Sequence, residues 1–279
     1  MNRTKIEVHP DKGNFINDNL SGVNLSNLDL SGTNFANTDL SYANLAYANL
    51  SGANFNNASL IGTNLKEANL SGANFNSANL RGANLSEIYG IGISLIGADL
   101  CNSNLKNADL SGCFLSYAAL INANLSGVYL IGSNLYAANL SGANLSNSCL
   151  MAASLIDAKL IDANLSNTCL NGLSLIGTYF GNGQLDSATL INADLNGAFL
   201  TGVDLGDANF ENAILIDVDF RGSTLAYIQV KGSIFGHNQG ISPIMKSNLI
   251  RRQAIFNESR IYGGNNALST CILTCDIDK

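Results

Sequence analysis

A large apolar side chain recurs at every fifth position along most of this chain. From Phe15 to Phe235, each of these 45 places holds Leu, Phe or Val, with the single exception of Gly90. The phase of the pattern never shifts, so no residue is inserted or lost over this stretch. A period of five matches neither the 3.6 residues of an α-helix nor the two residues of a flat strand. Such self-similarity predicts a solenoid, in which one short unit stacks on its neighbours.

The five places of each unit carry different chemistry, as residues 71–75 illustrate. Phe75 occupies the large apolar place, and Ala73 occupies a place that usually holds Ala, Ser, Thr or Val. Side chains two apart in an extended segment point the same way, so these two share an interior while Asn74 faces outward. Gly72 lies where a turn requires a positive φ, which favours Gly or Asn. The chain is therefore expected to turn once in every five residues.

A second period, of twenty residues, indicates how many units form one coil. Phe15, Phe35, Phe55 and Phe75 recur at this spacing. If four units make one coil, these rings stack on one wall, about 4.8 Å apart. The outward Asn side chains should form hydrogen-bonded ladders along the rod. We therefore predict an all-β solenoid, a parallel β-helix of about eleven coils.

The one missing core residue, at Gly90, predicts a local irregularity. Ile88 and Ile93 are larger than the Ala that is usual at their places. We expect them, together with Tyr89, to refill part of the lost volume, because an empty cavity is destabilising. The coil should kink near residues 86–95.

Several units resemble the pentapeptide repeat family, whose consensus is A(D/N)LXX. They include SGANF, RGANL, IGADL, KNADL and INADL, and the resemblance covers residues 13–235. It implies a right-handed quadrilateral β-helix with four short faces per coil. The best-understood members of the family bind DNA gyrase or topoisomerase IV as acidic rods that imitate duplex DNA, and they protect against topoisomerase poisons. Residues 15–235 lack the loops that interrupt the coils of plasmid-borne quinolone-resistance members.

The two ends of the solenoid should be covered, because open edges invite aggregation. We assign residues 1–12 to an N-terminal cap, where residues 5–8 form a covering strand, and residues 236–279 to an irregular C-terminal cap. Ser242 and Pro243 match the cap and first turn of a helix, which predicts a short helix near 243–252. Degraded units at 254–256, 259–261, 270–272 and 275–277 predict a last irregular coil after this insertion. The alternative is a wholly helical tail that joins two copies, as in several relatives.

Composition favours a binding protein over an enzyme. The 279 residues include two histidines, at the ends, and six scattered cysteines, of which Cys149 and Cys169 should stack as ordinary thiols. No paired acid and base or nucleophile is present, so we expect no catalysis, no cofactor and no metal site. No apolar run is long enough to span a membrane, and residues 1–13 lack the core of a signal peptide. We expect a cytoplasmic protein, although delivery by a specialised secretion system would leave no such mark.

Charge is distributed unevenly along the chain, whose net charge is −7. Residues 82–220 hold twelve acidic and two basic residues, a net of −10, whereas residues 221–279 have a net of +4. An acidic body does not bind nucleic acid directly, but it can bind proteins that do. The acidic residues that we assign to partner binding crowd the last third of the repeats: Asp157, Asp162, Asp186, Asp194, Asp204, Asp207, Asp217 and Asp219.

One wall of the rod should also be apolar. The residue after the large core place should face outward, and on the wall of Phe15 to Phe75 it is often Ile or Tyr. We call this set the apolar wall: Ile96, Tyr136, Ile156, Ile176 and Ile216. An apolar stripe on a soluble rod commonly marks a binding surface, although Ile also simply suits a strand, as other walls show.

Two functions therefore remain open. In the first, the acidic rod mimics DNA toward gyrase or topoisomerase IV. In the second, the apolar wall serves a protein-interaction scaffold or a secreted effector adaptor. A homodimer through the C-terminal end is compatible with both.

Overall fold

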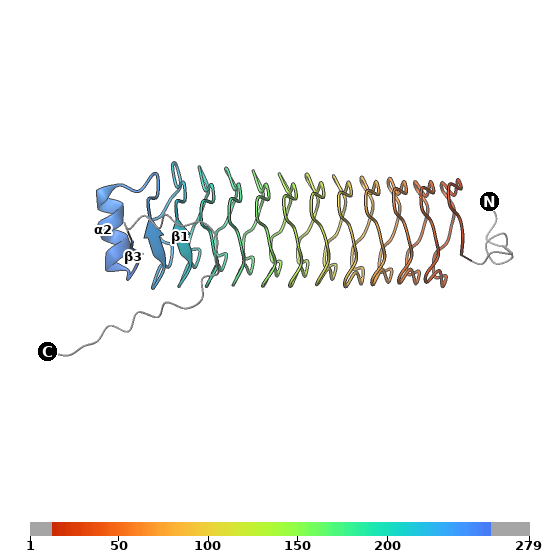
Figure 1. Cartoon of the computed structure of the whole chain (residues 1–279), viewed down its shortest axis with the longest axis horizontal. Coiled ribbons are helices and arrows are strands. Elements are labelled where there is room, and N and C mark those ends of the chain that lie inside the picture. The colour runs from red at the N-terminus through yellow and green to blue at the C-terminus, as the bar shows by residue number, and fades with distance from the viewer. Residues whose placement is uncertain (1–12, 258–279) are drawn as a thin grey trace, which may run out of the picture.

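The computed structural model describes residues 13–257 and shows a long rod of stacked coils, with a helix at its C-terminal end (Figure 1). Isolated parallel bridges join residues twenty apart, from Asn14 with Asn34 to Asp219 with Gln239. Turns recur every five residues between these bridges. These pairings confirm the parallel β-helix and its coil of four five-residue units.

Longer strands occur only near the C-terminal end of the described chain. They are β1 (Ile214–Ile216), β2 (Ile234–Gly236) and β3 (Ile255–Phe256), which form a parallel sheet in the order β1-β2-β3. Ile214 pairs with Ile234, which in turn pairs with Ile255. The first step is twenty residues and the second is twenty-one, because the chain inserts a helix between β2 and β3.

The corners of the coil follow the predicted turn chemistry. Gly72 has a φ of 64°, and Asn57, at the equivalent place, has a φ of 55°. Most turns are closed by a backbone bond such as Ala73 N–H to Leu70 O, 3.0 Å. Two of the corners hold Tyr42 and Tyr117 at a φ near 60°. Residues other than Gly adopt this backbone conformation at a cost in free energy. These residues are tolerated because hydrogen bonds from the neighbouring coil hold the backbone.

The interior is filled by the large and small apolar places, as predicted. Leu and Phe at the large place are almost all fully buried, and so are the Ala, Ser and Thr side chains two residues earlier. The predicted Phe stack is present, with ring centroids 5.3 Å, 5.0 Å and 4.4 Å apart from Phe15 through Phe35 and Phe55 to Phe75. The core therefore runs as continuous columns along the rod.

The kink expected at residues 86–95 is absent. Ile88 and Ile93 are buried and occupy the interior, as expected, but Tyr89 is 63% exposed and does not contribute. The rod runs straight through this region (Figure 1), and Gly90 N–H still donates to Asp109 O at 2.7 Å. A Cβ added at Gly90 would lie only 2.9 Å from a methyl carbon of Leu110, so neighbouring side chains already fill the space. The backbone bonds to the adjacent coils hold the register while these side chains close the gap.

The C-terminal end of the rod is covered by α2 (Pro243–Arg251), which lies across it in Figure 1. The helix forms near the predicted residues, and the Ser242 hydroxyl accepts from Met245 N–H at 3.2 Å. Leu249 is fully buried against the core.

Just beyond α2, Arg252 binds the backbone of the adjacent coil. Its guanidinium donates to the carbonyl oxygens of Leu225, Ala226 and Ile228 at 2.9–3.0 Å. Phe256 stacks on Phe235 with ring centroids 5.1 Å apart. The degraded unit predicted at 254–256 thus continues the coil. The covering strand at 5–8 and the units predicted after residue 257 lie outside the described residues.

The buried place can be tested with Leu140, which has no exposed surface. Leu140→Asp should lower the free energy of unfolding by an amount on the order of several kcal/mol, because it buries an unpaired carboxylate. The adjacent change Asn139→Asp, at a half-buried outward place, should have little effect. Urea unfolding followed by circular dichroism measures both. Equal stability of the two variants would show that the inward assignment is wrong.

Candidate protein-binding surfaces

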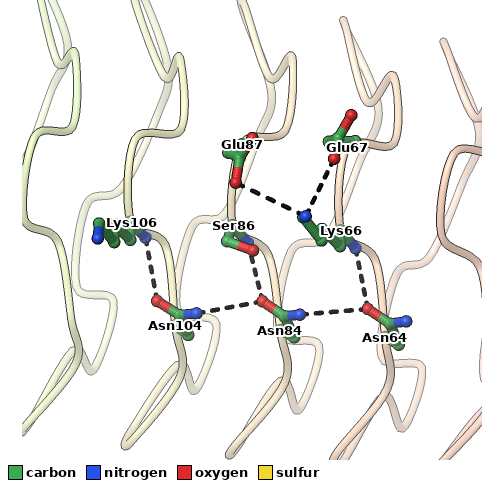
Figure 2. Close-up of polar contacts among 8 residues, drawn as sticks. All are labelled: Asn64, Lys66, Glu67, Asn84, Ser86, Glu87, Asn104 and Lys106. Carbon is green, nitrogen blue, oxygen red and sulfur yellow. Dashed lines mark hydrogen bonds and ion pairs between the residues drawn. The ribbon is translucent and has the colours of Figure 1, made fainter.

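An uninterrupted row of Asn runs along one face of the rod, which we call the Asn face. Its members, spaced by twenty residues, are Asn24, Asn44, Asn64, Asn84, Asn104, Asn124, Asn144 and Asn164. The Asn84 side-chain amide donates to Asn64 Oδ1 at 3.3 Å, and Asn104 donates to Asn84 in the same way (Figure 2). Each Oδ1 also accepts a backbone N–H two residues on, such as Lys66 N–H at 3.2 Å. The predicted ladder is confirmed over Asn24–Asn124, where it occupies the polar atoms of the row.

Beside this ladder, Lys66 lies between two carboxylates. Its Nζ is 3.1 Å from Glu67 Oε1 and 3.8 Å from Glu87 Oε1, as Figure 2 shows. The hydrogen bond to Glu67, and then the charge of Glu87, raise the pKa of Lys66. All three side chains are more than a third exposed, so water screens this cluster.

The assigned acidic residues do not share one face. They are distributed around the coil, at corners or outward places on every side but that of Leu30 and Leu50. Asp157 and Asp217 lie at the same corner three coils apart, and Asp194 faces outward beside it. Asp162 lies at the next corner, while Asp186, Asp204 and Asp207 lie on or beside the Asn face. Five of them are exposed and two, Asp186 and Asp194, are half-buried.

Two of these carboxylates are anchored by serines of neighbouring coils. The Ser166 hydroxyl donates to Asp186 at 2.5 Å, and both the hydroxyl and the N–H of Ser187 donate to Asp207 at 2.9 Å. The Ser187 contacts lower the pKa of Asp207. Asp207 is therefore held in its ionised form.

The assignment of Asp219 to partner binding is wrong. Its side chain is only 7% exposed, and its carboxylate binds the Arg221 guanidinium at 2.6 Å and 2.9 Å. Arg221 holds the pKa of Asp219 below its usual value, although burial acts in the opposite direction. The chain turns so that residues two apart reach each other here. Asp219 presents no free charge to a partner.

The apolar wall is exposed, but its composition differs from the prediction. Ile96, Tyr136 and Ile176 are 37–40% exposed, and Ile156 and Ile216 are half-buried. Asn196 occupies the intervening coil, so Ile216 is separated from the rest. Ser116 would interrupt the row between Ile96 and Tyr136 in the same way.

Two aromatic residues that sequence reasoning missed fill this gap. Tyr117 is 63% exposed, and its ring meets that of Tyr136 edge to face with centroids 5.4 Å apart. Phe114 is 48% exposed and pairs with Asn134 of the next coil. The signal was present, because Phe114 replaces the usual outward Asn and Tyr117 occupies a positive-φ corner. We call the resulting set the aromatic-aliphatic patch: Ile96, Phe114, Tyr117, Tyr136, Ile156 and Ile176.

A model of pentapeptide repeats matches this chain over residues 19–87 and 91–227 in overlapping copies. The chain belongs to the pentapeptide repeat family. Pentapeptide repeat proteins are structural and interaction proteins. No curated protein sequence matches the chain.

The chain is similar to several solved structures of pentapeptide repeat proteins, including these three. HetL, involved in heterocyst differentiation regulation in the cyanobacterium Nostoc sp. strain PCC 7120, is 28% identical, with 84% of this chain and 97% of that chain covered and a TM-score of 0.42. Full-length QnrB1, a plasmid-mediated fluoroquinolone resistance protein, is 19% identical, with 86% and 99% covered and a TM-score of 0.31. A protein from the Arabidopsis thaliana thylakoid lumen is 28% identical, with 46% and 71% covered and a TM-score of 0.19.

The remaining candidate chemistry of this pentapeptide repeat protein is sparse. Cys149 and Cys169 pair across neighbouring coils as free thiols, and His237 is exposed. His9 lies outside the described residues. Within residues 13–257, no group of three or more His, Cys, Asp or Glu could hold a metal ion. No helix in that part of the chain is long and apolar enough to cross a membrane.

The ion pair of Asp219 predicts a pH-dependent contribution to stability. Because its folded pKa is lowered, this contribution is present above the unfolded pKa and is lost as pH falls through the folded pKa. Asp219→Asn should therefore lower the urea midpoint at neutral pH, and the difference from wild type should shrink as the pH falls and Asp219 becomes protonated. Asp109→Asn, at a carboxylate that accepts from Ser111, is the control and should change the midpoint little. A difference that persists unchanged at low pH would contradict the assignment.

Proposed function

We propose that this protein acts by binding, without catalysis, and that its acidic rod imitates duplex DNA toward DNA gyrase or topoisomerase IV. Such binding would protect the enzyme from topoisomerase poisons. The observation that carries the proposal is the placement of exposed carboxylates around a straight, regular rod. The phosphates of DNA likewise wind around their axis, so a protein groove built for DNA can meet negative charge from more than one side.

The charge density supports the comparison in part. Residues 82–220 carry a net charge of −10, and the bordering Arg81 and Arg221 pair with Asp99 and Asp219, which brings the net to −8. These residues form about seven coils, or roughly 34 Å of rod, which gives one charge per about 4 Å. Duplex DNA carries one charge per about 1.7 Å. The rod is thus a weaker version of the same electrostatic surface.

The same charges argue against direct contact with nucleic acid, because phosphates would be repelled. The partner is therefore a protein with a basic, DNA-accommodating surface. We place this activity in the cytoplasm, where DNA topoisomerases work.

A second candidate function is a protein-interaction scaffold or a secreted effector adaptor that binds through the apolar wall. The observation that favours it is the exposed Tyr117 and Tyr136 ring pair, which lies on the same face of the rod as Ile96 and Ile156. Exposed aromatic residues in a contiguous patch are typical of binding surfaces.

The first function predicts that local carboxylates matter more than total charge. Replacing Asp157, Asp186, Asp207 and Asp217 by Asn should leave folding intact and weaken inhibition of gyrase supercoiling. Inhibition by wild type should also fall steeply with added salt, because exposed charges are screened. The readouts are supercoiling inhibition and protection from a topoisomerase poison.

A matched control removes the same amount of charge elsewhere. Asp18→Asn, Asp29→Asn, Asp39→Asn and Glu67→Gln lie outside residues 82–220, give the same net charge and should retain inhibition. Equal losses in both sets would show that only overall charge matters. If wild type neither inhibits nor protects, the topoisomerase proposal fails.

A further inference from the structure

The aromatic-aliphatic patch lies on the face of the rod that contains the Phe stack, which we call the Phe face. This face comprises residues 13–17 and the equivalent residues of each later coil, through 233–237. Phe114, Tyr117 and Tyr136 bring three aromatic side chains together there, and Ile156 and Ile176 continue the patch in the next two coils. Tyr is among the residue types that contribute most to binding energy at protein interfaces.

The charges of the Phe face are of one sign. No Lys or Arg occupies any of its places between residues 13 and 237, whereas Asp157, Asp194 and Asp217 do. Asp157 directly follows Ile156 at the corner. Asp194 lies one coil beyond Ser174, with which it forms a parallel β-bridge. The apolar patch therefore has one carboxylate, Asp157, at its edge, and Asp194 lies in the coil that follows its C-terminal end.

This pattern selects among possible occupants. A second copy that presented the same face would bring carboxylates together without a cation to pair with, which costs free energy. A membrane surface, which is negatively charged on its cytoplasmic side, would be repelled in the same way. A segment with apolar side chains flanked by Lys or Arg would satisfy both features of the patch.

The spacing of the patch favours a helix over other shapes. Ile96 and Ile176 are four coil steps apart, which is about 19 Å along the rod. A helix rises about 1.5 Å per residue, so some 13 residues cover this length. One turn of an α-helix advances about 5.4 Å, and one coil step advances about 4.8 Å. Apolar side chains on successive turns of a bound helix therefore stay close to successive coils of the patch.

We propose that the aromatic-aliphatic patch binds a basic amphipathic α-helix, about 13 residues long, of a partner protein. This inference rests on the second of the two proposed functions and specifies the chemistry of its partner. Apolar side chains of the helix pack against Tyr136, Ile156 and Ile176, and its Lys or Arg side chains face Asp157 and Asp194.

The test uses the full chain and a synthetic peptide. The probe is a fluorescein-labelled peptide of about 14 residues, with Leu at three places of each heptad on one helical face and Lys elsewhere. The test variant carries Tyr136→Ser, Ile156→Ser and Ile176→Ser. The control carries Ile61→Ser, Ile121→Ser and Ile161→Ser, which remove outward Ile side chains from another corner. Neither variant changes the charge of the chain. Circular dichroism confirms that both fold, and fluorescence polarisation measures binding.

We expect the test variant to bind the Lys peptide about tenfold or more weakly than wild type, and the control to bind it as wild type does. A peptide with Glu in place of Lys should bind wild type more weakly than the Lys peptide. Equal binding by the test variant and wild type would overturn both this inference and the scaffold function. Binding of the Glu peptide that is as strong as that of the Lys peptide, yet lost in the test variant, would keep the apolar surface and overturn the basic helix. Light scattering that shows a dimer in wild type and a monomer in the test variant would assign the patch to self-association instead.

Discussion

The stacking of one coil on the next by backbone hydrogen bonds determines everything else in this structure. Leu140 N–H, for example, donates to Lys159 O at 2.7 Å, and equivalent bonds recur along the rod. Because the coil holds twenty residues, bridged residues from Asn14 to Gln239 lie above partners twenty residues earlier. Core side chains form continuous columns. Outward side chains form rows along the rod, and successive side chains in a row are about 4.8 Å apart. A surface row therefore depends on which residues recur at a spacing of twenty. Local secondary structure alone would not bring these residues together.

Much of the fold could be predicted from that periodicity. The inward and outward places, the Phe stack, the Asn ladder and the short helix beginning at Pro243 follow from residue types and spacing. Gly90 shows the limit of such reasoning, because a local deficit was expected to bend the coil. Hydrogen bonds to the neighbouring coils hold that coil in register, and the side chains of Leu110 and Ile88 occupy the space beside Gly90.

The candidate surfaces were less predictable because they depend on contacts between coils. Asp219 looked like another outward acid, yet its carboxylate is held by Arg221 and shielded from solvent. The apolar wall appeared as a row at one place of the repeat, whereas Phe114 and Tyr117 join it from two other places. A row at one place of the repeat can be found by counting residues in the sequence. A patch that combines different places of the repeat can be found only once the positions of those places around each corner are known.

The central claim is that complete twenty-residue coils stack in register, and two deletions test it directly. Removing residues 44–63 takes out one whole coil and joins Ala43 to Asn64, so every later row keeps its place. Removing residues 44–61 deletes two residues fewer but shifts the phase against the preceding coils. Thermal unfolding followed by circular dichroism compares the two proteins. We predict a sharp transition close to that of wild type for the first and a marked loss of stability for the second. Similar transitions for both deletions would contradict the account.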